Sequence, residues 1–165
     1  MDHELVMAQY RAALSMLRAA MEVCPELLWN RTSDDNPFWQ IAYHTLFYAH
    51  LYLSHTEDEF APWAKHIEGY AHMGRLPRPP HDEPTIGDPY TVDDIREYLA
   101  HIERLLPDLV LTDEFDAPSG FYWLSFTRGE THLYNIRHIQ HHVGQLVERL
   151  RQTTGKGIDW IGTRP

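Results

Sequence analysis

Residues 127–152, TRGETHLYNIRHIQHHVGQLVERLRQ, are the stretch around which the rest of the chain is organised. Thr127 and Glu130 have the spacing of a capping box, which predicts a helix that starts near Arg128. Gly155 follows where a left-handed C-cap is expected. Apolar residues recur at helical spacing and predict one buried stripe, made of Leu133, Ile136, Val143, Leu146, Val147 and Leu150. The stretch therefore predicts an amphipathic helix that packs on other elements.

Three histidines lie in the middle of this predicted helix. His138 and His142 are four residues apart and share a face, which is the spacing that lets one helix chelate a transition metal. His142 falls about 100° and His138 about 140° from the centre of the apolar stripe. His141 falls roughly 160° away, so we expect it to face water. A 138/141 pair is also geometrically possible, and an exposed histidine-rich face explains the motif about equally well.

Further capping and proline signals predict three more helices, over about 3–23, 37–55 and 92–106. The first opens after Asp2, the second has Pro37 at its first helical position, and the third opens with Thr91 and Asp94. Pro107 breaks or kinks the third. Residues 56–90 contain five prolines in their second half, and only their first half is compatible with a short amphipathic helix. Residues 107–126 carry no decisive pattern.

The second predicted helix is apolar on nearly every side, which is typical of a buried helix. His44 is the one polar side chain near the middle of its apolar run, and a buried imidazole needs a partner. Alone, such a residue is more often a hydrogen-bonded core histidine than a ligand. Helical bundles build metal sites from facing inward residues, so His44 is the candidate partner of His138 and His142. Three imidazoles leave a coordination position open, as in catalytic rather than structural sites.

Composition restricts the classes of function. The 165 residues suit one domain, 1–165, and a formal net charge of -10 argues against a nucleic-acid partner. No apolar run approaches the length of a membrane span, and the amino terminus lacks the pattern of a secretion signal. Cys24 is the only cysteine, so no internal disulfide can form. We therefore expect a cytoplasmic protein that does not bind membranes.

The segment HIQHHVGQL, together with NPFWQIAYHTLFYAHLYL and its mid-span histidine, resembles the DinB/YfiT-like superfamily of metalloenzymes over most of the chain. The resemblance implies an all-α four-helix bundle, up-down-down-up, with a long crossover between helices two and three at residues 56–90. It implies a homodimer and a divalent ion, zinc or nickel, held by His44, His138 and His142. A basic residue often precedes the family's Gly-Gln, where this chain has Val143.

Characterised branches of that superfamily include transferases and isomerases that use low-molecular-weight thiols such as bacillithiol or mycothiol. The resemblance therefore implies a thiol-dependent S-transferase with a small-molecule substrate. Three neutral imidazoles leave the charge of the ion uncompensated, so a bound thiol or water would lose its proton near neutral pH. A metal-dependent hydrolase is the alternative enzyme. The non-catalytic alternative is a metal-binding bundle that acts as a dimeric interaction protein.

Two further side chains are candidates for contact with the site or its substrate. Tyr48 follows His44 by one helical turn, and Gln145 follows His142 by three residues. A core aromatic residue and a solvated amide explain them at least as well. Three tryptophans could line a pocket, although aromatic residues of a bundle more often belong to its core; they are Trp39, Trp63 and Trp123.

Overall fold

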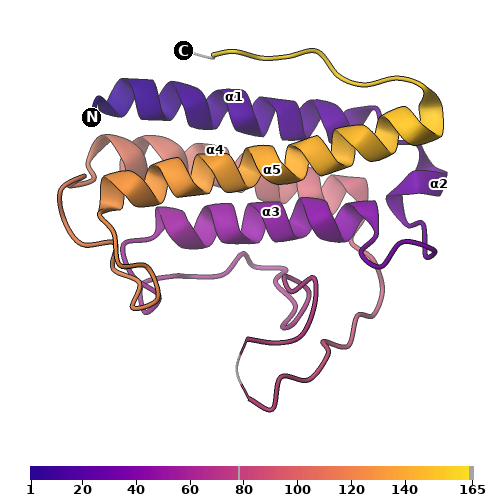
Figure 1. The fold of residues 1–165 in the computed structure, drawn as a ribbon, viewed down its shortest axis with the longest axis horizontal. Coiled ribbons are helices and arrows are strands. Elements are labelled where there is room, and N and C mark those ends of the chain that lie inside the picture. Colours follow the sequence, from indigo (N-terminus) through magenta and orange to yellow (C-terminus); the bar gives the residue numbers. More distant parts are fainter. Residues whose placement is uncertain (78, 164–165) are drawn as a thin grey trace.

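The computed structural model describes residues 1–77 and 79–163. These residues form five α-helices and no strand, which are α1 (His3–Glu22), α2 (Glu26–Trp29), α3 (Phe38–Leu53), α4 (Val92–Leu111) and α5 (Arg128–Thr154). The four long helices pack side by side as a bundle, and α2 is a single turn between α1 and α3 (Figure 1). The predicted all-α class is confirmed. None of the described helices is long and apolar enough to cross a membrane.

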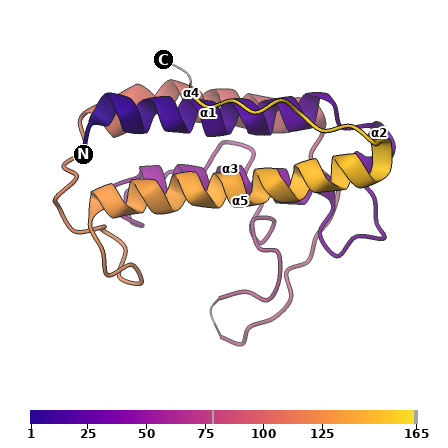
Figure 2. The same ribbon diagram turned by 45° about the horizontal axis from the view of Figure 1, so that its top comes forward.

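The order of the helices around the bundle places α3 beside α5. α1 packs against α4 and α5, and α3 packs against the same two helices. α1 and α5 run in one direction and α3 and α4 in the other, so the topology is up-down-down-up (Figures 1 and 2). Because α3 and α4 are parallel, the crossover at residues 56–90 must return along the length of the bundle (Figure 1). α3 and α5 are therefore antiparallel neighbours.

The capping signals in the sequence set the ends of most helices. Asp2, Thr91 and Thr127 are the N-caps of α1, α4 and α5, and their side chains accept hydrogen bonds from first-turn N–H groups. Gly155 ends α5 in the left-handed conformation at φ 73°. Pro37, predicted as the first helical residue of α3, is instead its N-cap.

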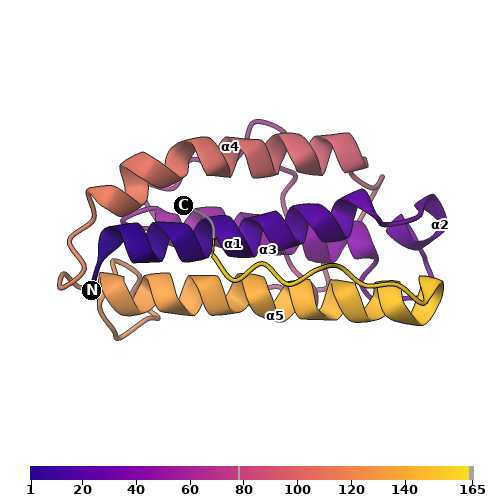
Figure 3. The ribbon, with the colours of Figure 1, turned by 90° about the horizontal axis from the view of Figure 1, so that it is seen from above.

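α4 is longer than the sequence predicts. It continues through Pro107 to Leu111, so the proline, which was expected to end or kink the helix near Leu106, does not end it there. Val110 explains the extension, because it is fully buried one turn beyond Leu106. Its burial offsets the backbone hydrogen bond that proline cannot donate. The last turns of α4 bend away from the line of its first turns (Figure 3).

The described part of the crossover contains turns but no helix, so the short amphipathic helix considered for its first half does not form. Aromatic side chains hold the crossover to the bundle instead. Trp63, Tyr70 and Tyr90 are each at least nine-tenths buried, and the Trp63 ring stacks on Tyr98 of α4 at 4.7 Å. The crossover is thus packed on the bundle at these three residues, whereas most of its described residues between Gly74 and Pro89 are exposed.

The three tryptophans named above have different environments. Trp39 and Trp63 belong to the core, whereas Trp123 lies on the loop between α4 and α5 and is 40% exposed. The chain after α5 runs back along α1 and α5 (Figures 1 and 3). Ile158 and Ile161 pack against the core there, while Trp160 of the same segment is exposed.

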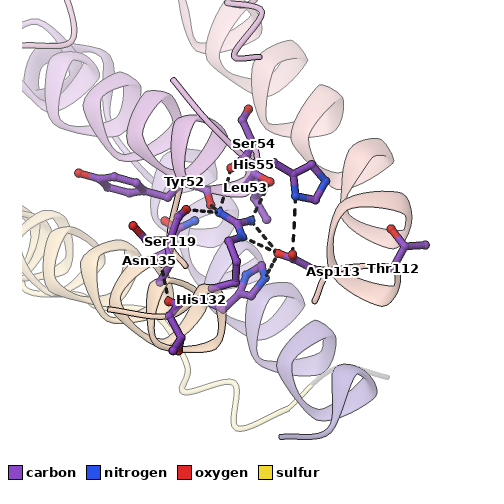
Figure 4. Close-up of polar contacts among 12 residues, drawn as sticks. Tyr52, Leu53, Ser54, His55, Thr112, Asp113, Ser119, His132 and Asn135 are labelled. Carbon is purple, nitrogen blue, oxygen red and sulfur yellow. Dashed lines mark hydrogen bonds and ion pairs between the residues drawn. The ribbon is translucent and has the colours of Figure 1, made fainter. Parts of the chain in front are cut away.

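A buried polar cluster closes the end of the bundle where α3 and α4 finish and α5 begins (Figure 4). Arg128 and Asp113 form an ion pair with 2.7 Å between Nη2 and Oδ2, and both side chains are almost fully buried. The Arg128 guanidinium also donates to the carbonyl oxygens of Leu53 and Ser54, at the end of α3, and of Ser119 in the following loop. One side chain therefore holds three segments together.

His132 and Tyr10 extend this cluster into the core. The Nε2–H of His132 donates to Asp113 at 2.8 Å, and the Tyr10 hydroxyl donates to His132 Nδ1 at 3.0 Å. Burial raises the pKa of Asp113, but the hydrogen bonds from His132 and Arg128 outweigh it, so this pKa lies below its ordinary value. His132 and Tyr10 are inaccessible to solvent. The cluster is consequently structural.

This cluster changes the buried face of α5. Leu133, assigned to the apolar stripe from the sequence, is 55% exposed. The first turns of α5 instead bury Thr131, His132 and Asn135. The close packing of the loop before α5 also requires a glycine, because a Cβ on Gly120 (φ 82°) would lie 1.8 Å from the carbonyl oxygen of His55.

Candidate metal centre

The structure brings His44 of α3 together with His138 and His142 of α5. The Nε2 atom of His138 lies 3.1 Å from Nε2 of His44 and 3.1 Å from Nε2 of His142. One potential ligand atom from each residue lies within 4.8 Å of the other two. These three residues are the only group of this kind among the described His, Cys, Asp and Glu side chains. No fourth His, Cys, Asp or Glu side chain of the described residues joins them.

Packing sets the register that brings these rings together. Asn135, fully buried on α5, donates from Nδ2 to the carbonyl oxygen of Ala49 on α3 at 2.9 Å. Ile139 and Val143 follow His138 and His142 by one residue and are buried in the core. Their burial leaves the two histidines at the seam between α5 and α3. This position beside the buried face of α5 agrees with the angles of about 100° and 140° from the apolar stripe that helical geometry gives for His142 and His138.

The second ring nitrogens of two histidines are held by hydrogen bonds. The Nδ1–H of His44 donates to the carbonyl oxygen of Ala71 in the crossover at 2.6 Å. The Nδ1–H of His142 donates to Oε1 of Gln145 at 2.8 Å. The Gln145 amide in turn donates from Nε2 to His141 Nε2 at 3.2 Å. Because each of these two rings carries its proton on Nδ1, the Nε2 lone pairs of His44 and His142 are directed at the centre of the group.

The three converging nitrogens are arranged as ligands of a cation rather than as hydrogen-bond partners of one another. A proton on His138 Nε2 can be donated to only one of the two facing lone pairs, so the other remains without a donor. The Nδ1 atom of His138 is buried and has no hydrogen-bond partner among the described residues. Hydrogen bonds among the three rings therefore cannot satisfy all three converging nitrogens, whereas one divalent transition metal ion can bind all of them.

Burial keeps the three rings neutral. It lowers the pKa of His44 to about 4, although the hydrogen bond to Ala71 opposes the shift. Burial and the neighbouring imidazoles lower the pKa of His138 to about 3, and burial also lowers the pKa of His142. A metal ion therefore displaces no proton from these nitrogens at neutral pH.

The structure places both further candidates from the sequence beside the three histidines. The Tyr48 ring packs against the rings of His44 at 4.7 Å and His138 at 5.8 Å. Gln145 is exposed but contacts His142 directly. His141 is exposed, as its helical angle predicts. It contacts Gln145 and the edge of the His142 ring and is not one of the three converging residues.

The crossover supplies contacts that the sequence does not reveal. Gln40 donates from Nε2 to the carbonyl oxygen of His72 at 3.0 Å, and Nδ1 of His72 lies 3.5 Å from the Tyr48 hydroxyl. With the Ala71 carbonyl on His44, residues 71 and 72 are thus held by three side chains of α3 spaced four apart. Polar groups at positions 40, 44 and 48 of an otherwise apolar helix indicate that this face has polar partners. No pattern in the crossover sequence identifies Ala71 or His72 as those partners.

A four-helix bundle with three converging imidazoles defines a class of metal-binding helical proteins. The family model of the DinB superfamily matches residues 9–146, a range that includes all three histidines, and the chain belongs to this superfamily. No curated protein and no solved structure matches the chain. The family and the histidine cluster together fit a metal-binding site.

Proposed function

We propose that this protein is a metal-dependent enzyme that transfers a low-molecular-weight thiol to an electrophile, with His44, His138 and His142 as ligands of zinc or nickel. The observation that carries the proposal is a group of three neutral imidazoles that no further His, Cys, Asp or Glu joins among residues 1–77 and 79–163. Structural zinc sites are closed by four protein ligands, whereas catalytic sites leave a position for water or substrate.

A divalent cation in this site would lower the pKa of a thiol that coordinates it, because neutral imidazoles leave its charge uncompensated. Neighbouring residues orient the ligands and form one side of the open coordination position. Ala71 and Gln145 fix the orientation of two rings, and Tyr48 forms an aromatic wall beside His44 and His138. Contacts between sulfur and aromatic rings are favourable, which supports a thiol rather than water as the bound group.

The test is conjugation of monochlorobimane by purified protein, with a panel of small thiols and with zinc, nickel or no metal. We expect the metal-loaded protein to react at least about tenfold faster than the stripped protein, because only the ion supplies the ionised thiol. Equal rates across all thiols would contradict thiol transfer. Metal-dependent hydrolysis of ester or amide substrates would then select the hydrolase, and its absence would select a non-catalytic bundle.

The same purified samples test the assembly. We propose a homodimer, on the basis of the resemblance to the superfamily, and expect sedimentation at a mass of two chains. A monomer at working concentration would contradict this part of the proposal without affecting the metal centre, since all three histidines belong to one chain.

A further inference from the structure

Aromatic side chains continue from the three histidines along the seam between α3 and α5. On α3, Tyr48 and Tyr52 follow His44 at intervals of four residues. On α5, Tyr134 precedes His138 by one turn. Because the two helices are antiparallel, these tyrosines lie on the same side of the histidines. The Tyr52 ring lies 6.0 Å from Tyr48 and 5.4 Å from Tyr134.

The loop between α4 and α5 extends this surface. Phe121 packs on Tyr52 at 5.4 Å, Phe126 packs on Tyr134 at 5.8 Å, and Trp123 packs on Phe121 at 5.3 Å. The Tyr52 ring is directed away from the buried Asp113 cluster (Figure 4). We call the following six residues the aromatic surface: Tyr48, Tyr52, Phe121, Trp123, Phe126 and Tyr134.

The aromatic surface is separate from the main core. Tyr52 and Phe121 are buried in a second apolar cluster, against which Tyr48 and Tyr134 are only partly buried. Trp123 at its margin is 40% exposed. Partly exposed aromatic rings that adjoin a site with an open position are typical of ligand contacts, since burying them further releases water from apolar surface.

A positive charge lies beside these rings. Arg137 precedes His138 in the sequence, and its guanidinium lies 5.5 Å from the centre of the Tyr134 ring. It is exposed and makes no ion pair with the described residues, in a chain whose formal net charge is -10. An anionic group on a ligand that stacks on Tyr134 would be within reach of this guanidinium.

We propose that the partly exposed rings of the aromatic surface, which pack over the buried Tyr52 and Phe121, bind the ring of an aromatic electrophile that carries an anionic group, and that Arg137 binds the anion. The inference rests on the proposed thiol transfer and names its second substrate. In the reaction, the thiol sulfur forms a bond to the ring carbon that bears the leaving group. The thiol proton passes to water when the thiol ionises, the bond to the leaving group breaks, and that group departs as an anion with the bonding electron pair. No oxidant or reductant is required.

Three electrophiles test the substrate class in the metal-loaded protein: 4-chloro-3,5-dinitrobenzoate, 1-chloro-2,4-dinitrobenzene and iodoacetamide, with uncatalysed rates subtracted. We expect Tyr134→Leu and Trp123→Leu to raise KM for both aryl chlorides by about tenfold and to leave iodoacetamide unchanged. Arg137→Gln should raise KM for the benzoate alone. Trp160→Leu is the matched control, because Trp160 is 75% exposed and lies on the segment after α5, outside the aromatic surface. Each variant must retain its metal content.

Binding to metal-free protein separates the two proposals. The probe is the product in which N-acetylcysteine has replaced chloride on dinitrobenzoate, measured by titration calorimetry. We expect weaker binding by about tenfold in Tyr134→Leu and no change in Trp160→Leu. Thiol conjugation with equal effects from Trp160→Leu and Tyr134→Leu would overturn the aromatic surface and leave thiol transfer intact. Tyr134-dependent binding without conjugation of any electrophile would overturn thiol transfer while supporting aromatic ligand binding.

Discussion

The three histidines differ in how their rings are held. His44 is fixed by a backbone carbonyl, which no side-chain substitution removes, whereas His142 depends on the Gln145 amide. His138 has no partner on Nδ1 among the described residues and is located by its place on α5 between the other two rings. Metal affinity should therefore respond to substitution in a graded way, strongest at the ligands and weaker at Gln145.

Removal of a ligand is the first expected outcome. His142→Ala deletes one of three imidazoles, so the metal content of purified protein should fall well below that of the wild type. His141→Ala should leave it near the wild-type value, because His141 contacts only Gln145 and neighbouring rings. Elemental analysis of both variants checks this. Equal loss of metal from the two would contradict the assignment of His142 as a ligand.

Gln145→Leu tests the role of the amide. The substitution leaves the Nδ1–H of His142 without its acceptor, so metal affinity should fall by about 10- to 100-fold. Competition with a chelator of known affinity measures the change. Gln152→Leu is the matched control on the same helix, because Gln152 is exposed and bonds only to Glu148. Unchanged affinity in Gln145→Leu would show that the hydrogen bond does not support the metal centre.

The side of the helix on which each histidine lies can be predicted from the sequence, because helical spacing is a local property. Residues four apart share a face whatever surrounds them, and the angle from the apolar stripe places His141 in solvent. The hydrogen-bond partners of these histidines cannot be predicted in the same way, because they depend on contacts that are distant in the sequence. Ala71 reaches His44 through the path of the crossover, which is set by burial of aromatic side chains rather than by periodicity.

At the scale of elements, the start of α5 depends on Arg128 more than on its capping box. Arg128→Met would remove the cation beside the buried Asp113 carboxylate and would free the carbonyl oxygens at the end of α3. The carboxylate would keep two histidine partners, His132 at 2.8 Å and His55 at 3.6 Å. We expect a loss of about 3–5 kcal/mol in the free energy of unfolding.

Urea unfolding checks this expectation, with Arg137→Met as the control. Arg137 is an exposed residue of the same helix, so its substitution should change the unfolding free energy by less than about 0.5 kcal/mol. A similar stability of the two variants would show that the buried ion pair contributes little. Arg128 was not identified from the sequence, because the partners that hold it lie on two other segments.

Element boundaries show where local rules were sufficient. The N-caps of α1, α4 and α5 and the C-cap of α5 follow from residues within one turn of each end. The end of α4 does not, because burial of Val110 outweighs the local effect of Pro107. Leu133 is exposed for a similar reason, since buried polar groups occupy the inner face of that part of α5.

At the scale of the whole molecule, several histidines are buried in the neutral form. Burial lowers the pKa to about 4 for His44 and His50 and to about 3 for His138. Unfolded histidines titrate near 6.5, so below that pH the unfolded chain binds protons that the folded chain does not. The contribution of these histidines to the free energy of unfolding is therefore fully present above about pH 6.5 and is lost as the pH falls toward their folded-state pKa values.

The expected loss is large enough to measure. Between pH 6.5 and pH 5 each of these histidines contributes about 1–2 kcal/mol of destabilisation. Metal-free protein, kept so by a chelator, should melt at least about 5 °C lower at pH 5 than at pH 7.5. Thermal unfolding followed by circular dichroism gives both midpoints. Equal midpoints would mean that these rings are solvated in the absence of metal.

The overall arrangement was only partly predictable from the residues. Four helices and their apolar faces follow from periodicity and caps, but the neighbours of each helix do not. The up-down-down-up order came from resemblance to the superfamily, because nothing local distinguishes a crossover that returns along the bundle from a simple hairpin. The antiparallel contact of α3 with α5, on which the metal centre depends, is a property of the whole chain.

The placement of the metal centre on α3 and α5 has a consequence for biosynthesis. His44 and His138 are 94 residues apart, and closing a loop of that length costs about 4 kcal/mol of chain entropy. While the chain emerges from the ribosome, every intermediate that ends before α5 carries a single histidine of the three. The proposed three-ligand site is complete only after α5 has docked on α3. Binding of the proposed ion by all three histidines would thus be a late event that marks completion of the native topology.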